Sequence, residues 1–127
     1  MDQETRHTLA VTSRENAGIT FVKMQGSLSA TTAEQGLQAM QKIVDSGAKK
    51  VVVNLADVDY ISSGGIRVLI LSSKQLHNVH GEMKIAAAKG MVKEALEAGG
   101  FNLLTRVYGE TNQLCNTEEE AAAAFKS

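Results

Sequence analysis

Two serines followed by two glycines, Ser62-Ser63-Gly64-Gly65, are the residues of this chain best suited to chemistry. They follow a β-prone run and open a stretch with helical spacing, so we expect them at the start of a helix. The first turn of a helix leaves backbone N–H groups unpaired, and the helix dipole adds partial positive charge there. Such a place could hold a phosphoryl group, or carry one on a serine, with the glycines leaving the approach to the N–H donors open.

A simpler interpretation of the same residues is structural. Serine is a preferred N-cap residue, and glycine is common where a strand turns into a helix, so the four residues could serve only as a cap. The segment matches neither the phosphate-binding P-loop, nor the dinucleotide fingerprint, nor the nucleophile elbow. Two of the histidines, His77 and His80, fall about four turns further along the same helix, so no general base is placed beside the serines. We therefore predict no catalytic residue and no enzyme activity.

Other reactive side chains give no metal or cofactor site. His77 and His80 are three residues apart, but they suit the last turn of a helix, and no third ligand is placed beside them. The only cysteine, Cys115, has neither a second cysteine nor a basic cluster nearby, which predicts an inert thiol. We expect no metal and no cofactor.

Composition limits the kinds of partner. The 127 residues, 43% of them apolar, suit one domain with one core. A net charge of −1 removes the usual electrostatic attraction to nucleic acid or to an anionic membrane. No apolar run approaches the length of a spanning helix, and the first residues, 1–4, lack the layout of a signal peptide. We expect a cytoplasmic protein that neither inserts into membranes nor binds nucleic acid directly, with a protein or small molecule as its partner.

Strand and helix signals alternate along the chain. Two β-prone runs joined by a polar turn over 14–18 predict a hairpin. The expected strands are 8–13, 19–25, 51–55, 83–88 and 103–108, and the expected helices begin near 33, at Ser62 or Ser63, at 91 and at 118, the last capped by Thr117. Right-handed strand–helix–strand crossovers place the later strands parallel in one sheet, which predicts a mixed α/β fold with helices packed over the sheet.

This order of elements, together with the residues at the junctions, resembles the STAS domain, and specifically the bacterial anti-sigma factor antagonists. The resemblance spans nearly the whole chain, including the Gly26-Ser27-Leu28 step before the first helix. It is strongest at residues 61–69, Ile-Ser-Ser-Gly-Gly-Ile-Arg-Val-Leu, beside the common family form Ile-Ser-Ser-Ala-Gly-Leu-Arg-Val-Leu. It implies a single STAS-like domain over residues 1–127, with a mixed β-sheet, an N-terminal hairpin and about four helices packed over the sheet.

The resemblance also implies a phosphorylation switch. In the family, the first serine of the pair is phosphorylated by an anti-sigma factor that is also a serine kinase, and a PP2C-type phosphatase reverses the reaction. On this chain that serine is Ser62, with Ser63 as the second choice. The unphosphorylated protein would capture the anti-sigma factor and so free a sigma factor. Ile61 and Ser29 stand where many members carry aspartate, a difference that bears on which kinase recognises the site.

We expect Ser62 to lie in a partner-binding surface formed by the junction and the exposed face of the following helix, with its hydroxyl within reach of a kinase. A phosphate there is expected near the carboxylates of Asp57 and Asp59, and like charges in an interface cost on the order of several kcal/mol. The alternative is a non-phosphorylated STAS adaptor subunit of a transporter or signalling complex, in which the serines only cap the helix. The predicted partner-binding residues are Asp57, Asp59, Ile61, Ser62, Ser63, Gly64 and Arg67.

Overall fold

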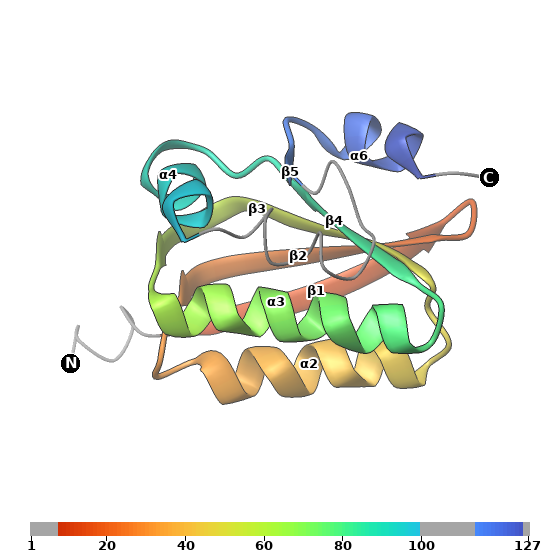
Figure 1. Ribbon diagram of the computed structural model, residues 1–127, viewed down its shortest axis with the longest axis horizontal. Helices are drawn as coiled ribbons and strands as arrows, with labels where there is room; N and C mark the ends of the chain where they lie inside the picture. The colour runs from red at the N-terminus through yellow and green to blue at the C-terminus, as the bar shows by residue number, and fades with distance from the viewer. Residues whose placement is uncertain (1–7, 100–113, 126–127) are drawn as a thin grey trace.

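The computed structural model describes residues 8–99 and 114–125, which form one sheet with helices on both faces (Figure 1). The elements follow the predicted order, and the mixed sheet with its N-terminal hairpin is confirmed. The strand expected over 103–108 lies outside the described residues. In chain order the elements are β1 (Leu9–Asn16), β2 (Ile19–Leu28), α2 (Ala33–Asp45), β3 (Lys50–Ile61), α3 (Ser63–Asn78), β4 (Glu82–Ala86), α4 (Gly90–Ala98), β5 (Leu114–Cys115) and α6 (Glu118–Ala124).

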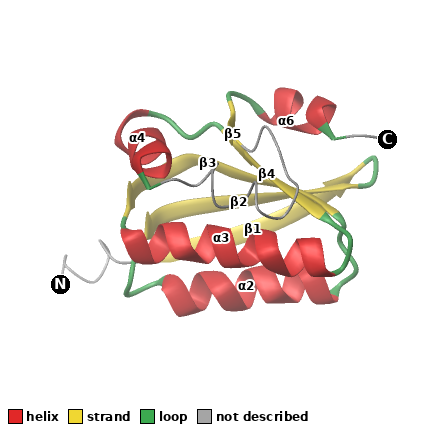
Figure 2. Ribbon diagram, in the orientation of Figure 1, coloured by secondary structure: helices red, strands yellow, loops and turns green. Residues whose placement is uncertain are grey.

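The strands lie side by side in the order β1-β2-β3-β4-β5. β1 and β2 are antiparallel, whereas each later strand runs parallel to its neighbour. Parallel neighbours need a crossover, and α2 and α3 supply the crossovers on either side of β3. The two helices lie next to each other on one face of the sheet, and α6 covers the other face (Figure 2). Among the described helices, none combines the length and the hydropathy needed to cross a membrane.

The central strand, β3, is buried on both faces of the sheet. Val51, Val52 and Val53 are each 0% exposed. Val51 and Val53 belong to the core beneath α2 and α3, whereas Val52 packs with Phe21 and Ala121 beneath α6. This double coverage is the reason that residues 51–53 of β3 are a continuous apolar run rather than an alternating one.

The hairpin is tighter than the sequence predicted. β1 continues to Asn16 and β2 begins at Ile19, so only Ala17 and Gly18 form the turn. Both have positive φ, 55° and 84°, as a two-residue hairpin turn that matches the twist of its strands requires. Residues 14–16, predicted as part of the turn, pair with β2 instead.

Strand β1 forms one edge of the sheet, and side chains from other elements hold it. From α2, Gln35 Nε2 donates to the carbonyl oxygen of Leu9 at 2.5 Å. Arg14 lies over the ring of Phe21, 4.5 Å from its centroid, and its Nη2 is 2.9 Å from Glu118 Oε1 at the start of α6. The first strand is therefore tied both to the first described helix and to the last.

Helix α6 begins with a cap and a paired carboxylate. Thr117 Oγ1 accepts from the N–H of Glu120 at 3.0 Å, which confirms the predicted cap. Glu118 accepts from Arg14 and, through Oε2, from Asn54 Nδ2 at 2.8 Å. These two donors, Arg14 first, hold the pKa of the Glu118 carboxyl below its ordinary value of 4.5.

Replacing Glu118 by glutamine should lower the free energy of unfolding at neutral pH by about 0.5–1 kcal/mol, the size expected for a partly exposed ion pair. Because the folded-state pKa is lowered, the carboxylate stabilises the fold above its ordinary pKa, and this contribution is lost as the pH falls through the folded value. Urea unfolding of both proteins at pH 7 and pH 3 measures the effect. Glu119→Gln, in the same turn, is the matched control, and an equal loss in the two variants would contradict the assignment.

Candidate functional site

The predicted site lies at the junction between β3 and α3. β3 ends at Ile61, Ser62 occupies the N-cap position, and α3 begins at Ser63. The backbone of Ser62 is extended, with φ −113° and ψ 177°. Its N–H donates to the carbonyl oxygen of Leu28 at 3.1 Å, and its carbonyl accepts from the N–H of Ile66 at 2.9 Å. The first bond fixes the junction to the end of β2, and the second starts the helix where the sequence predicted it.

The two serine hydroxyls lie in different environments. Ser63 is exposed. Ser62 is half-buried, and its Oγ is shielded from solvent, so the expectation that this hydroxyl lies within reach of a kinase is wrong for this conformation. The Oγ has no hydrogen-bond partner and makes no cap hydrogen bond. The simplest interpretation of the sequence, that this hydroxyl caps the helix, is therefore wrong. A buried hydroxyl without a partner costs about 1–3 kcal/mol, so a group that reaches the Ser62 Oγ and pairs with it would stabilise this end of α3.

The two glycines pack closely rather than leaving the helix start open. A Cβ at Gly65 would collide with the carbonyl oxygen of Leu28 and lie 2.7 Å from its carbonyl carbon. A Cβ at Gly64 would lie 3.1 Å from Cα of Ala30. The sequence suggested an uncrowded approach to the N–H donors; instead, the absence of side chains lets the first turn of α3 rest against the segment that joins β2 to α2.

That joining segment adds a cluster of hydroxyls beside the start of α3. The N–H of Ser29 donates to Thr32 Oγ1 at 2.9 Å, Thr32 Oγ1 donates to the carbonyl of Ser27 at 2.9 Å, and the hydroxyls of Ser29 and Thr31 are 3.0 Å apart. Ser29 is buried, so its hydroxyl belongs to the interior side of this cluster. Thr31 and Thr32 were missed by the sequence reasoning because only the fold brings this segment to a junction some thirty residues later in the chain.

The two predicted aspartates lie further from Ser62 than expected. Because β3 continues to Ile61, Asp57 is roughly 17 Å and Asp59 about 10 Å from Ser62 along the strand, both beyond a physiological Debye length of about 8 Å. Asp57 also pairs with Lys23 Nζ at 3.1 Å, and this partner lowers the pKa of the Asp57 carboxyl. Direct repulsion between a phosphate and these carboxylates is therefore weaker than the sequence suggested.

The other residues predicted to bind a partner divide between surface and core. Arg67 and Ser63 are exposed on the first turns of α3. Ile61 is only 4% exposed, and its Cγ1 would lie 3.0 Å from a Cβ at Gly65. As the last residue of β3, Ile61 points into the core and cannot contact a partner directly in this conformation.

Comparison with known proteins identifies the architecture. The family model described as "STAS domain" matches residues 10–121, which include every described strand and helix except the last residues of α6 and the first of β1. The chain belongs to the STAS domain family. BtrV of Bordetella bronchiseptica, provisionally named an anti-sigma factor antagonist, is 38% identical over 110 residues, which cover 87% of this chain and 89% of BtrV.

Solved structures share this STAS fold at low sequence identity. An anti-sigma factor antagonist from Mycobacterium paratuberculosis matches with a TM-score of 0.79 and 18% identity over 92% of this chain and 93% of that chain. The Bacillus cell fate determinant SpoIIAA in its phosphorylated form matches with a TM-score of 0.64 and 16% identity over 90% of this chain and 97% of that chain. At these identities the likeness establishes the fold.

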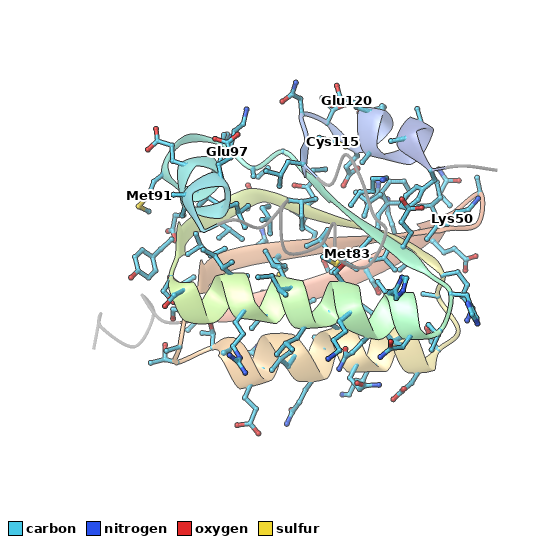
Figure 3. The ribbon with its side chains drawn as sticks, in the orientation of Figure 1. Lys50, Met83, Met91, Glu97, Cys115 and Glu120 are labelled. Carbon is cyan, nitrogen blue, oxygen red and sulfur yellow. The ribbon has the colours of Figure 1, made fainter. Side chains whose placement is uncertain are left out.

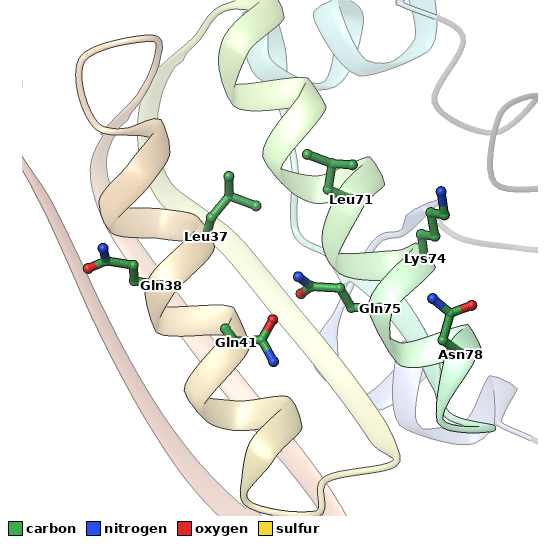
Figure 4. A pocket seen from close by; sticks show the side chains of 7 residues that line it. All are labelled: Leu37, Gln38, Gln41, Leu71, Lys74, Gln75 and Asn78. Atoms are coloured by element: carbon green, nitrogen blue, oxygen red, sulfur yellow. The ribbon is translucent and has the colours of Figure 1, made fainter.

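A concavity of this STAS domain lies between α2 and α3, away from the β3–α3 junction, and has a volume of about 380 Å³ (Figure 4). It includes no residue predicted for the site, and its lining contains no histidine, cysteine or carboxylate that could act as an acid or base. The carbonyl oxygen of the Gln75 side chain is buried there without a hydrogen-bond partner. The lining residues are Leu37, Gln38, Gln41, Leu71, Lys74, Gln75 and Asn78.

Metal ligands do not gather in the described part of this STAS domain. Within residues 8–99 and 114–125, no group of three or more histidine, cysteine, aspartate or glutamate side chains is placed to hold a metal ion. Cys115 lies beside α6 (Figure 3), and burial raises the pKa of its thiol, which makes the reactive thiolate scarcer.

Proposed function

We propose that this protein is an anti-sigma factor antagonist that acts as a single cytoplasmic STAS-like domain over residues 1–127. Unphosphorylated, it binds an anti-sigma factor that is also a serine kinase, and a sigma factor is thereby freed. Phosphorylation of Ser62 ends the complex, and a PP2C-type phosphatase restores it. The observation that carries the proposal is the similarity to BtrV, which extends over most of both chains.

The environment of Ser62 is compatible with a phosphate acceptor that must turn before it reacts. Its Oγ has no hydrogen bond to lose, and rotation about χ1 between staggered positions is fast in a partly exposed side chain. Once attached, a phosphate brings three strong acceptor oxygens to the positive end of a 16-residue helix. We propose that kinase binding selects the outward rotamer of Ser62.

Desolvation, rather than repulsion by nearby carboxylates, is the main way in which a phosphate would end the complex. Asp57 is distant and paired with Lys23, so it contributes little. A group with a charge of about −1.5 to −2 must give up water when a partner covers it, unless that partner offers a matching cation. An interface fitted to a neutral serine offers none, and each ~1.4 kcal/mol of this penalty lowers the affinity tenfold.

The test is to mix the purified protein with ATP and with each serine-kinase anti-sigma factor encoded by the same genome, and then to locate any phosphate by fragmentation mass spectrometry. We expect one phosphate on Ser62, none in Ser62→Ala, and unchanged modification in Ser63→Ala. Loss of the phosphate in Ser63→Ala alone would move the assignment to Ser63. Binding to a transporter subunit, with no phosphate acquired from any of these kinases, would instead favour the adaptor role.

A further inference from the structure

Large apolar side chains are exposed at two positions in the described part of the chain. Tyr60 is 45% exposed and Met91 is 50% exposed, while the remaining large apolar residues of that part are at least half-buried or packed in the cores. Tyr60 lies near the end of β3, and Met91 lies in the first turn of α4 (Figure 3). Exposed aromatic and methionine side chains are enriched at protein interfaces, where they supply much of the binding energy.

Both side chains lie at the end of the molecule that carries Ser62. Tyr60 is two residues before Ser62, about 7 Å along the strand. α4 packs against β3, and its last turn touches the first turn of α3, since a Cβ at Gly99 would lie 3.1 Å from Cδ1 of Ile66. Met91 is eight residues before Gly99, which is about 12 Å along a helix.

An interface of ordinary size centred on Ser62 is large enough to include both Tyr60 and Met91. A standard interface covers about 800 Å² on each protein, a patch of roughly 16 Å radius. A protein that encloses Ser62 and extends across β3 to α4 therefore covers Tyr60 and reaches Met91. The alternative direction, along α3, leads to Lys74 and the groove beside α2, where four of the seven lining residues carry amide side chains.

We propose that Tyr60 and Met91 are the apolar anchors by which the anti-sigma factor is held at the β3–α3 junction, so that α4 forms part of the docking surface. This inference rests on the proposed function and adds two residues and a helix to the predicted surface. The partner that fits has an apolar cleft for a phenol ring and a thioether. The exposed charged side chains around the two anchors are Asp59, Arg67, Lys89, Lys93 and Glu94.

The anchors explain how one phosphate could end binding without altering the fold. Apolar anchors contribute most when the surrounding polar groups exclude water from them. A hydrated phosphate two residues from Tyr60 would keep water in the middle of the docking surface, and the anchors would then contribute little to binding. The cost of desolvating the phosphate would weaken binding further. The residues that supply the binding energy and the residue that is phosphorylated therefore lie in the same surface patch.

The test measures affinity by titration calorimetry with the purified anti-sigma factor that phosphorylates the wild-type protein. Tyr60→Ser and Met91→Ser should each weaken binding at least about tenfold, and Tyr60→Phe should retain most of the affinity because the ring remains. Lys74→Ser, which shortens a long exposed side chain further along α3, is the control and should bind like the wild type. Thermal unfolding of each variant verifies that the fold is intact.

The outcomes separate this inference from the proposed function. Wild-type affinity in both serine variants, with a wild-type protein that does bind, would overturn the anchors alone. A greater loss in Lys74→Ser than in Tyr60→Ser would overturn them in favour of the α2–α3 groove. Failure of the wild-type protein to bind any anti-sigma factor would overturn the proposed function itself, and the anchors with it. If gel filtration shows a dimer that Tyr60→Ser abolishes while partner binding is unchanged, the patch joins two copies of this chain and the inference is wrong.

Discussion

Ser62→Asp should bind the anti-sigma factor about thirtyfold more weakly than the wild type, whereas Ser62→Ala should bind as tightly as the unphosphorylated protein. Alanine removes a hydroxyl that has no hydrogen-bond partner, so no hydrogen bond is lost within the fold. Aspartate is a favoured N-cap residue, so the helix is preserved while a carboxylate is added at the surface that the partner covers. A thirtyfold change corresponds to about 2 kcal/mol, within the range for an unmatched charge in an interface.

Titration calorimetry with purified proteins measures these affinities, and Ser62→Asn separates charge from size. Asparagine has nearly the shape of aspartate but no charge, and we expect its affinity to lie close to that of Ser62→Ala. Equal affinities of the alanine and aspartate variants would exclude a switch that works through charge at Ser62. Equal weakening by asparagine and aspartate would show that bulk, rather than charge, blocks the partner.

Gly65→Ala should lower the free energy of unfolding by about 2–4 kcal/mol, the largest stability effect that we expect from a single methyl group in this chain. The new Cβ would meet the carbonyl of Leu28, which is backbone and already accepts from the N–H of Ser62. Relief requires the start of α3 to move away from β2, which would lengthen that hydrogen bond. Urea unfolding monitored by circular dichroism measures the loss.

Gly64→Ala is the matched control, because it makes the same substitution one position earlier in the same helical turn. Both changes gain about 1 kcal/mol of helix propensity. At Gly64 the nearest neighbour would be Cα of Ala30 at 3.1 Å, a tight contact but not a collision. We expect a net effect within about 1 kcal/mol of zero, and an equal loss in both variants would contradict the close contact with Leu28.

The fold was predictable from the sequence where an element is buried in a regular pattern. The apolar spacing of Ala33, Leu37, Met40 and Val44 predicted α2, and the valine run predicted a strand covered on both faces. The buried side of α3 was predicted less well. The helical spacing predicted a buried face formed by Ile66, Leu69, Ile70, Ser73 and Leu76 or His77. Leu69, Ser73 and Leu76 are buried, but so are Val68 and Ser72, and His77 is exposed. Because α3 packs against α2 as well as against the sheet, its buried side is wider than the single stripe of residues that the spacing predicts.

The candidate site was predictable in position but not in detail. Its place at a helix start follows from local signals, since a buried strand is followed by serine, glycine and helical spacing. Contacts between segments distant in the chain decide the rest: the packing of residues 28–30 against Gly64 and Gly65 closes the approach that looked open. The length of β3 is the second cause, because it places Asp57 well before the junction and directs Ile61 into the core. Neither is visible in residue types alone.

The protected edge of the sheet matters if this protein acts, as proposed, by stoichiometric capture of its partner. To titrate its target, an antagonist must be at least as abundant as that target, and at high abundance an open strand invites polymerisation into fibres. On β1 the outward carbonyl of Leu9 is already occupied by Gln35, and the far half of the strand carries the charged pair Arg14 and Glu15. Removing Gln35 would thus threaten solubility before it altered recognition, with turbidity rather than affinity as the first sign.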